Sequence, residues 1–159
     1  MIVVQPTLAP SVTIDERRAK EDVVDNVIAR IVVADDDPDI RRLVAFTLRR
    51  RGHTVLEAAS GDVALALISD ELPDLAVLDM MMPGLTGLEV IHALAAEPKT
   101  ARVPVVLLSA KGQVNEVQSG LDSGARAYLV KPFVPRDLAE KVAGILCAGP
   151  GTSGDPSGA

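Results

Sequence analysis

The sequence predicts an α/β protein built on a doubly wound five-stranded parallel sheet with helices on both faces. Short apolar runs alternate five times with helical patterns between residues 30 and 147, which is typical of right-handed βαβ units. Hydrophobic residues make up 48% of the 159 residues but aromatic residues only 2%, so the core is aliphatic. Such a core favours a buried parallel sheet, and the length suits one domain.

The elements follow from local patterns. We expect strands at about residues 30–35, 53–58, 74–79, 104–109 and 126–130. The first helix begins at Pro38 and ends at Gly52, with its arginines on a solvated face, and the second is capped by Ser60. The third begins near Thr86, a weaker helical pattern covers residues 114–123, and the last helix begins at Pro135.

Two segments lie outside this block. Residues 1–29 form an N-terminal extension in which residues 13–16 fit a capping box, so residues 14–28 are expected to form an amphipathic helix. Its apolar positions are Ala19, Val23, Val24, Val27 and Ile28. Residues 148–159 are rich in Gly, Pro and Ser, which predicts a disordered tail, and no output domain is expected after them.

Composition excludes several classes of protein. The formal charge of -6 and the pI near 4.9 argue against direct contact with nucleic acid, which needs a basic surface. The single cysteine, Cys147, predicts no internal disulfide and a reducing compartment. No run approaches the roughly 20 apolar residues of a membrane-spanning helix. We therefore expect no membrane insertion and a cytoplasmic location.

Polar side chains stand at the ends of four predicted strands. The first strand ends in Asp35 and Asp36, the third in Asp79, the fourth in Ser109 and the fifth in Lys131. Because the loops that follow parallel strands meet at one edge of a doubly wound sheet, we expect these side chains to converge.

This combination of side chains suits phosphoryl transfer. Carboxylates hold a hard divalent cation such as Mg²⁺, while an ammonium and a hydroxyl neutralise phosphoryl oxygens. The nucleophile is expected to be the carboxylate on the central strand, which gives an aspartyl phosphate. We assign that role to Asp79, with Lys131 and Ser109 beside it.

Four motifs in order and spacing carry a family resemblance. The region from about Arg30 to Leu146 resembles the receiver domain of bacterial two-component response regulators. The motifs are Val33-Ala34-Asp35-Asp36-Asp37-Pro38, Leu78-Asp79-Met80-Met81-Met82-Pro83-Gly84, Leu108-Ser109-Ala110-Lys111 and Tyr128-Leu129-Val130-Lys131-Pro132-Phe133.

The resemblance implies a flavodoxin-like strand order, 2-1-3-4-5, and a phosphoacceptor aspartate. Asp79 would take a phosphoryl group from a sensor histidine kinase or a phosphotransfer protein. Asp36 and Asp79 would bind Mg²⁺ directly, Asp35 through water and Met81 through its backbone carbonyl. Lys131 would pair with the phosphoryl group, and its bond to Pro132 would be cis.

The resemblance also implies a switch and a control on lifetime. Ser109 would move towards the phosphoryl group and open a space into which Tyr128 turns. Met81 and Lys111 would line the approach of hydrolytic water, and with these two bulky side chains we expect slow autodephosphorylation.

The function implied is that of a stand-alone phosphoacceptor that signals through a downstream protein target. It would catalyse only its own phosphoryl transfer and autodephosphorylation, and so would not be an enzyme in the usual sense. Receivers can dimerise on phosphorylation, but those that pair through the fourth helix, fifth strand and fifth helix usually carry an acidic pair just before the switch tyrosine. This chain has Arg126-Ala127 there, which argues against pairing of that kind.

Two other functions fit these residues less well, and some polar residues are expected to have only structural roles. A phosphatase of the haloacid dehalogenase type also forms an aspartyl phosphate, but it needs an aspartate two residues after the nucleophile, where this chain has Met81. A phosphorylation-independent adaptor is disfavoured by the intact set of site residues. Asp37 is expected to cap a helix, His53 to face solvent at a strand start, and neither His53 nor His92 to bind a metal.

Overall fold

The computed structural model describes residues 28–110 and 124–148. Its elements, in chain order, are β1 (Arg30–Ala34), α2 (Pro38–Arg50), β2 (Thr54–Ala58), α3 (Gly61–Glu71), β3 (Leu75–Asp79), α4 (Gly87–Ala96), β4 (Val105–Ala110), β5 (Ala127–Lys131) and α6 (Pro135–Ala148). The strands pair in parallel in the order β2-β1-β3-β4-β5, which confirms the expected fold class and strand order.

Some expectations lie outside these residues. The helix expected over 14–28 falls on residues that the structure does not describe, except Ile28, which lies outside any helix. The helix expected over 114–123 and the tail from residue 149 also fall on segments that are not described. Ala148, which we expected to begin the tail, is the last residue of α6.

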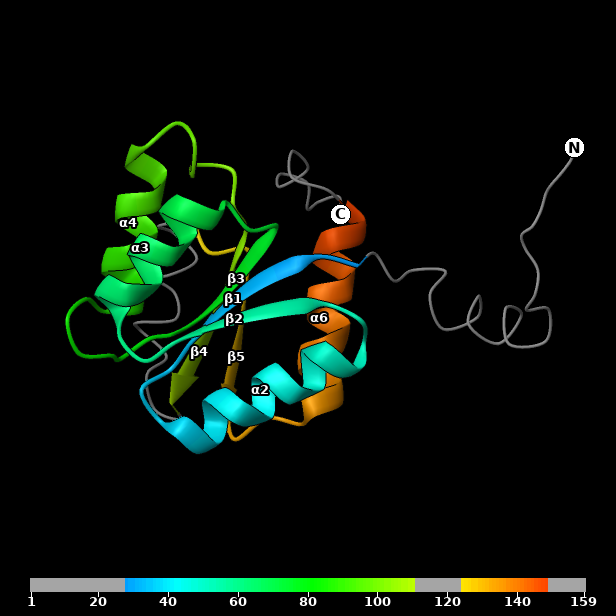
Figure 1. Cartoon of the computed structure of the whole chain (residues 1–159). Coiled ribbons are helices and arrows are strands. Elements are labelled where there is room, and N and C mark those ends of the chain that lie inside the picture. Colours follow the sequence, from blue (N-terminus) through cyan, green and yellow to red (C-terminus); the bar gives the residue numbers. More distant parts are fainter. Residues whose placement is uncertain (1–27, 111–123, 149–159) are drawn as a thin grey trace, which may run out of the picture.

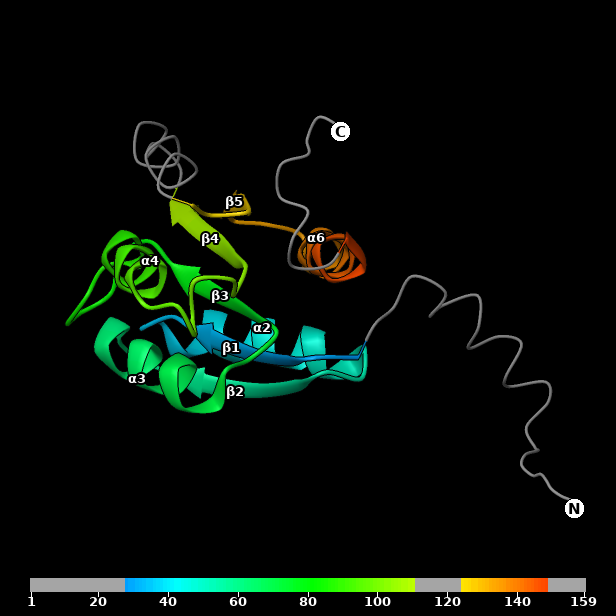
Figure 2. The same ribbon diagram turned by 90° about the horizontal axis from the view of Figure 1, so that it is seen from above.

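The sheet is covered on both faces. Figures 1 and 2 show α2 and α6 against one face and α3 and α4 against the other. Successive strand residues point to opposite faces, so Ile31 and Val33 pack with α2 and α6 while Val32 and Ala34 pack with α3 and α4. All five residues of β3 are buried, as expected for the central strand of a parallel sheet.

Three helices begin where their side chains can cap them. Asp37 Oδ1 accepts a hydrogen bond from Asp39 N at 2.9 Å, and Ser60 Oγ accepts one from Val63 N at 3.4 Å. Thr86 and Glu89 form a reciprocal capping box at α4. The predicted starts of these helices are therefore confirmed to within one residue.

The arginines of α2 do not all face solvent as predicted. The Arg41 side chain is only 19% exposed; it contacts Glu57 Oε1 at 3.3 Å and donates to the Asp35 carbonyl at 2.8 Å. Arg49 donates to the Val55 carbonyl at 2.8 Å and contacts Glu57 Oε2 at 3.1 Å. Because Glu57 lies on β2, these two arginines link α2 to this edge strand and do not only face the solvent.

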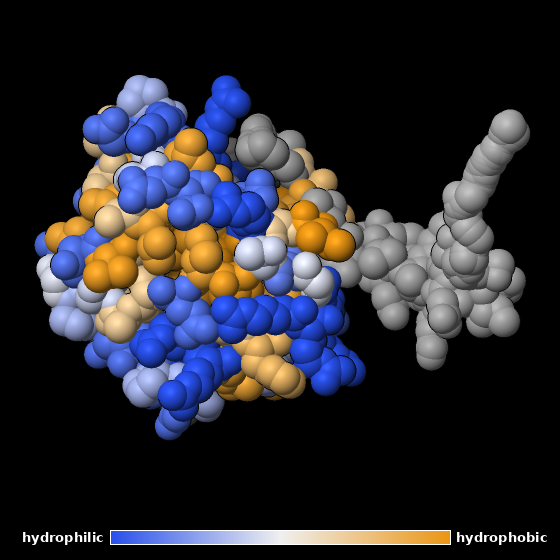
Figure 3. All heavy atoms as spheres, viewed as in Figure 1, coloured by the Kyte–Doolittle hydropathy of each residue, from blue (hydrophilic) through white to orange (hydrophobic). Residues whose placement is uncertain are grey.

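The surface mixes charged and apolar areas. On the face drawn in Figure 3, apolar side chains gather over α3 and the neighbouring strands, with charged side chains around them. Among the helices that the structure describes, none combines the length and the apolar character needed to cross a membrane.

His53 is buried, and the prediction that it faces solvent is wrong. It is 5% exposed, and its Nδ1 accepts a hydrogen bond from Ala29 N at 3.0 Å. The sequence predicts His53 as the first residue of the strand, whereas β2 begins at Thr54, and the chain entering β1 covers His53. Burial, and to a lesser extent the positive charge of Arg51, lower the pKa of His53 from its usual value of 6.5.

A tight contact fixes the loop between β3 and α4. Gly61 N donates to the Pro83 carbonyl at 3.0 Å, and a Cβ at Gly61 would lie 1.9 Å from the Leu85 carbonyl oxygen. Gly84 has φ +83°, and a Cβ there would lie 2.1 Å from Asp62 Oδ1. The start of α3 thus holds the loop that follows Asp79.

We expect Gly61→Ala to lower the free energy of unfolding by about 1–3 kcal/mol, because the methyl group can fit only if the loop moves. The measurement is urea unfolding, with chemical shifts of residues 80–86 as the reporter of loop movement. Gly144→Ala is the matched control, since nothing lies within 4 Å of a Cβ on that helical glycine. Equal stability of the two variants would contradict the prediction.

We expect the burial of His53 to make stability depend on pH. The unfolded chain binds a proton at His53 near pH 6.5 and the folded protein only at lower pH, so the stability is complete above 6.5 and falls as the pH drops below it. His53→Asn keeps an acceptor for Ala29 N but cannot titrate. Urea unfolding from about pH 8 to about pH 5 should show a smaller pH dependence in the variant; parallel curves would refute the assignment.

Candidate functional site

The polar strand ends converge at the carboxyl edge of the sheet. Asp35 directly follows β1, Asp79 ends β3, Ser109 lies in β4 and Lys131 ends β5. These four strands are consecutive in the sheet, so their carboxyl ends form one continuous row. The structure therefore brings together the residues that the sequence placed far apart.

The Lys131 ammonium lies between two aspartates. Its Nζ is 2.9 Å from Asp79 Oδ1 and 3.0 Å from Asp35 Oδ2. Both carboxylates are buried, while the lysine side chain is 22% exposed. A positive charge between two buried negative charges offsets part of the cost of removing them from water.

The three aspartates form a set of ligands that could hold a metal ion. Carboxylate oxygens of Asp35, Asp36 and Asp79 all lie within 4.8 Å of one another. Asp35 Oδ2 is buried and accepts no well-aligned hydrogen bond from any described atom, although the Lys131 ammonium is nearby. An under-satisfied oxygen among three hard oxygen ligands fits a divalent cation such as Mg²⁺.

The site shifts the pKa values of its central pair. Burial raises the pKa of Asp79 to about 6; the nearby Asp35 and Asp36 also raise it, while Lys131 opposes the shift. Burial disfavours the Lys131 charge, but the carboxylates of Asp79 and Asp35, at 2.9 and 3.0 Å, outweigh burial and raise the pKa of the lysine. The ionised form of Asp79 is therefore destabilised, and an added positive charge would stabilise it.

Backbone contacts orient the aspartates. Asp35 Oδ1 accepts from Asp37 N at 2.9 Å, and Asp35 N donates to the Ala58 carbonyl at 3.2 Å. Beyond Asp79, Met80 N donates to the Leu108 carbonyl at 2.8 Å. Arg41, already described, holds the Asp35 carbonyl from α2.

Arg41 is a residue of the site that the sequence does not identify. Its only sequence signal is its place in the first turn of the helix after Asp35, which fits a solvated arginine equally well. Its contact with the Asp35 carbonyl depends on how α2 packs against the sheet, which no local pattern reveals.

Ser109 and Tyr128 lie on one face of the sheet. Ser109 pairs in register with Val130 and Leu107 with Tyr128, so alternation along the strands points Ser109 and Tyr128 to the same side. Ser109 is buried and its Oγ donates to the Ala110 carbonyl at 3.2 Å, whereas Tyr128 is 38% exposed. The two side chains therefore lie on the same side of the neighbouring strands β4 and β5.

Three predicted features of the site remain: Met81, Lys111 and the cis bond before Pro132. Met81 is 53% exposed, two residues beyond Asp79. Lys111 lies outside the described residues. The bond between Lys131 and Pro132 is cis, as the resemblance implies.

The curated proteins include close relatives. The chain is 39% identical over 127 residues to the phosphate regulon transcriptional regulatory protein PhoB of Pseudomonas aeruginosa, an alignment that covers 79% of this chain and 56% of PhoB. It is 38% identical over 119 residues to the DNA-binding response regulator MtrA of Mycolicibacterium smegmatis, covering 75% of this chain and 51% of MtrA. The chain thus spans about half the length of the curated relatives it matches.

Solved structures and a family model agree with this. The receiver domain of the Francisella response regulator 1452 aligns with a TM-score of 0.68 and 33% identity, covering 75% of this chain and 96% of that one. The chemotaxis response regulator CheY4 of Vibrio cholerae aligns with a TM-score of 0.68 and 32% identity, covering 73% and 97%. The family model for the response regulator receiver domain matches residues 31–143. The chain therefore belongs to the response regulator receiver domain family.

Proposed function

We propose that the protein is a phosphoacceptor, phosphorylated on Asp79 by a sensor histidine kinase or a phosphotransfer protein in the presence of Mg²⁺. The observation that carries the proposal is the position of Asp79, buried at the end of the central strand with Lys131 Nζ at 2.9 Å. Two further carboxylates lie within 4.8 Å. Family membership supports the same function.

The transfer is a displacement at phosphorus. An Asp79 carboxylate oxygen attacks the phosphoryl group of a phosphohistidine, the P–O bond forms as the P–N bond breaks, and the imidazole leaves with its electron pair. Lys131 and the Ser109 hydroxyl contact the phosphoryl oxygens in this proposal. Asp35, Asp36, Asp79 and the Met81 carbonyl would hold Mg²⁺, which neutralises the charge that accumulates.

Phosphorylation would change the partner of the Lys131 ammonium. In the resting site the Lys131 ammonium is shared between Asp35 and Asp79. A phosphoryl dianion on Asp79 offers the lysine a stronger partner, and movement of Ser109 towards the same oxygens frees space on the face that also carries Tyr128. We propose that this rearrangement is read by a downstream protein target in the cytoplasm.

The alternatives have less support. A phosphatase of the haloacid dehalogenase type requires a general acid two residues after the nucleophile, and the methionine at position 81 cannot donate a proton. A phosphorylation-independent adaptor would not require the Asp35–Lys131–Asp79 arrangement. The name of MtrA includes DNA binding, but this chain spans only about half of MtrA, and we do not propose DNA binding for the residues described.

We expect Asp79→Asn to abolish labelling by acetyl phosphate and Mg²⁺, because the amide is not a nucleophile. Intact-protein mass spectrometry measures the transient gain of one phosphoryl group. Asp70→Asn is the matched control: it makes the same substitution at an exposed aspartate of α3 and should label like the unchanged protein.

The same experiment separates the three functions. Transient labelling that depends on Asp79 supports the phosphoacceptor. Rapid turnover of a phosphate monoester would favour the phosphatase, and no labelling at any Mg²⁺ concentration would favour the adaptor.

We expect Met81→Asn to speed the loss of phosphate from Asp79. Met81 is exposed beside the site, and a smaller polar side chain would admit and orient the attacking water. The decay of the phosphorylated protein, followed by mass spectrometry after removal of acetyl phosphate, measures the rate. An unchanged decay would show that Met81 does not limit the approach of water; Val134→Asn, another exposed apolar position, controls for nonspecific effects.

A further inference from the structure

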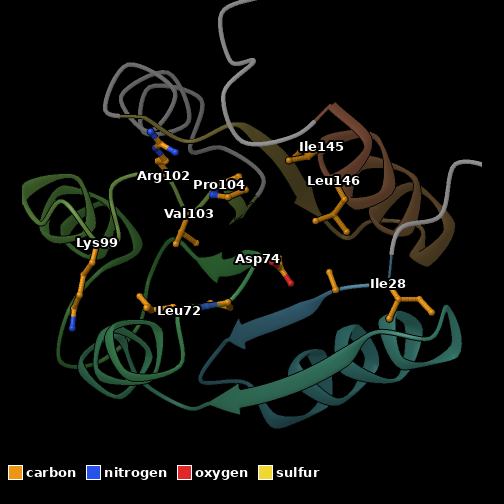
Figure 4. A pocket seen from close by; sticks show the side chains of 11 residues that line it. Ile28, Leu72, Asp74, Lys99, Arg102, Val103, Pro104, Ile145 and Leu146 are labelled. Atoms are coloured by element: carbon orange, nitrogen blue, oxygen red, sulfur yellow. The ribbon is translucent and has the colours of Figure 1, made fainter.

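A hollow of about 420 Å³ opens at the amino edge of the sheet, opposite the Asp79 site. Its wall is formed by the entry to β1, the link from α3 to β3, the link before β4 and the end of α6, as Figure 4 shows. Its apolar lining includes Ile28, Leu72, Val103, Ile145 and Leu146.

The apolar lining of this hollow reaches the surface. Ile28 is 67% exposed and Leu72 is 47% exposed. Lys99 and Arg102 are exposed at the same hollow, and neither forms an ion pair with any residue that the structure describes. The surface thus combines exposed apolar side chains with two positive charges that lack a described counter-ion.

The exposed Leu72 has an unfavourable backbone conformation. It ends α3 with φ 47° and ψ 62°, the left-handed conformation that glycine or asparagine adopts with less strain. A leucine there is destabilised by roughly 1 kcal/mol. The capping hydrogen bond, from Leu72 N to the Ile68 carbonyl, involves only backbone atoms and does not require a leucine side chain.

We propose that residues 14–27 of this same chain form an amphipathic helix that docks into the hollow. The segment is joined directly to Ile28, which itself lines the hollow, so it is present at a local concentration on the order of millimolar. On a helical wheel Ala19, Val23, Val27 and Val24 share one side, which also carries Lys20. A helix of this length would extend about 21 Å.

Residues 14–27 contain five acidic and three basic side chains, so the segment as a whole is negatively charged and complements the two positive charges at the hollow. Glu21, Asp22 and Asp25 lie in the part of the segment that is nearest to Ile28 in the sequence. They can approach Lys99 and Arg102, whose charges are otherwise uncompensated within the described residues. Each exposed pair contributes little by itself, so the apolar side drives docking and the charges orient it.

The other terminal segment is a poorer occupant. Residues 149–159 contain no apolar side chain larger than proline, so they have little surface to bury in the hollow. A second copy of the chain could offer its own residues 14–27, which makes the dependence on concentration part of the test. The proposal does not depend on chemistry at Asp79.

Amide hydrogen exchange of the full chain tests docking directly. A helix of this length is marginal in water by itself, so protection of residues 17–27 requires that the segment be docked. We expect protection in the unchanged protein and its loss in the Val23→Glu, Val27→Glu double variant. Asn26→Glu adds the same charge per site on the polar side and should leave protection intact.

Leu72→Asn tests the location of docking. Asparagine tolerates the left-handed conformation, so α3 remains capped, while the loss of the exposed leucine side chain that the docked helix would cover should lower protection of residues 17–27 about tenfold or more. Unprotected amides in the unchanged protein, or full protection in the Leu72 variant, would overturn the proposal. Protection that disappears on dilution, together with a dimeric mass, would instead assign the hollow to a second copy and would also overturn it.

Discussion

The ion pairs of Lys131 with Asp35 and Asp79 are the interaction on which the site depends. The central strand delivers Asp79 into a buried position, where a lone carboxylate would be strongly disfavoured. β5 is two strands away from β3, a separation of about 10 Å, and the side chains of Lys131 and Asp79 reach towards each other to bridge it. The ammonium holds the carboxylates together in the resting protein and, in our proposal, becomes the partner of the phosphoryl group.

The parallel sheet separates two different surfaces. Every strand ends at the carboxyl edge, where the charged groups gather, and begins at the amino edge, where the hollow and its apolar rim lie. Because both faces of the sheet are covered by helices, these two edges are where the chain can present the sheet to ligands. Phosphorylation at one edge and docking of residues 14–27 at the other would therefore use the same architecture without competing for space.

The rigidity of the site comes from packing contacts around it. Gly61 lets the start of α3 contact the loop after β3 closely, and Arg41 ties α2 to the backbone of Asp35. The first contact acts on the loop after Asp79 and the second on the backbone carbonyl of Asp35, and neither involves the carboxylates themselves. They fix where the carboxylates lie, which matters because a metal ion and a phosphoryl group must be bound at the same time.

The sequence alone determined the class of fold, the strand order through family resemblance, and the residues at the four strand ends. The strands and the residues at their ends are local features: an apolar run marks a strand, and the polar residue that ends the run must stand at the carboxyl edge. The tertiary structure alone decided that His53 is buried, that Arg41 supports Asp35, and that Leu72 borders a hollow. Each of these features depends on contacts between segments that are distant in the sequence. The residues next to each position in the chain do not indicate those contacts.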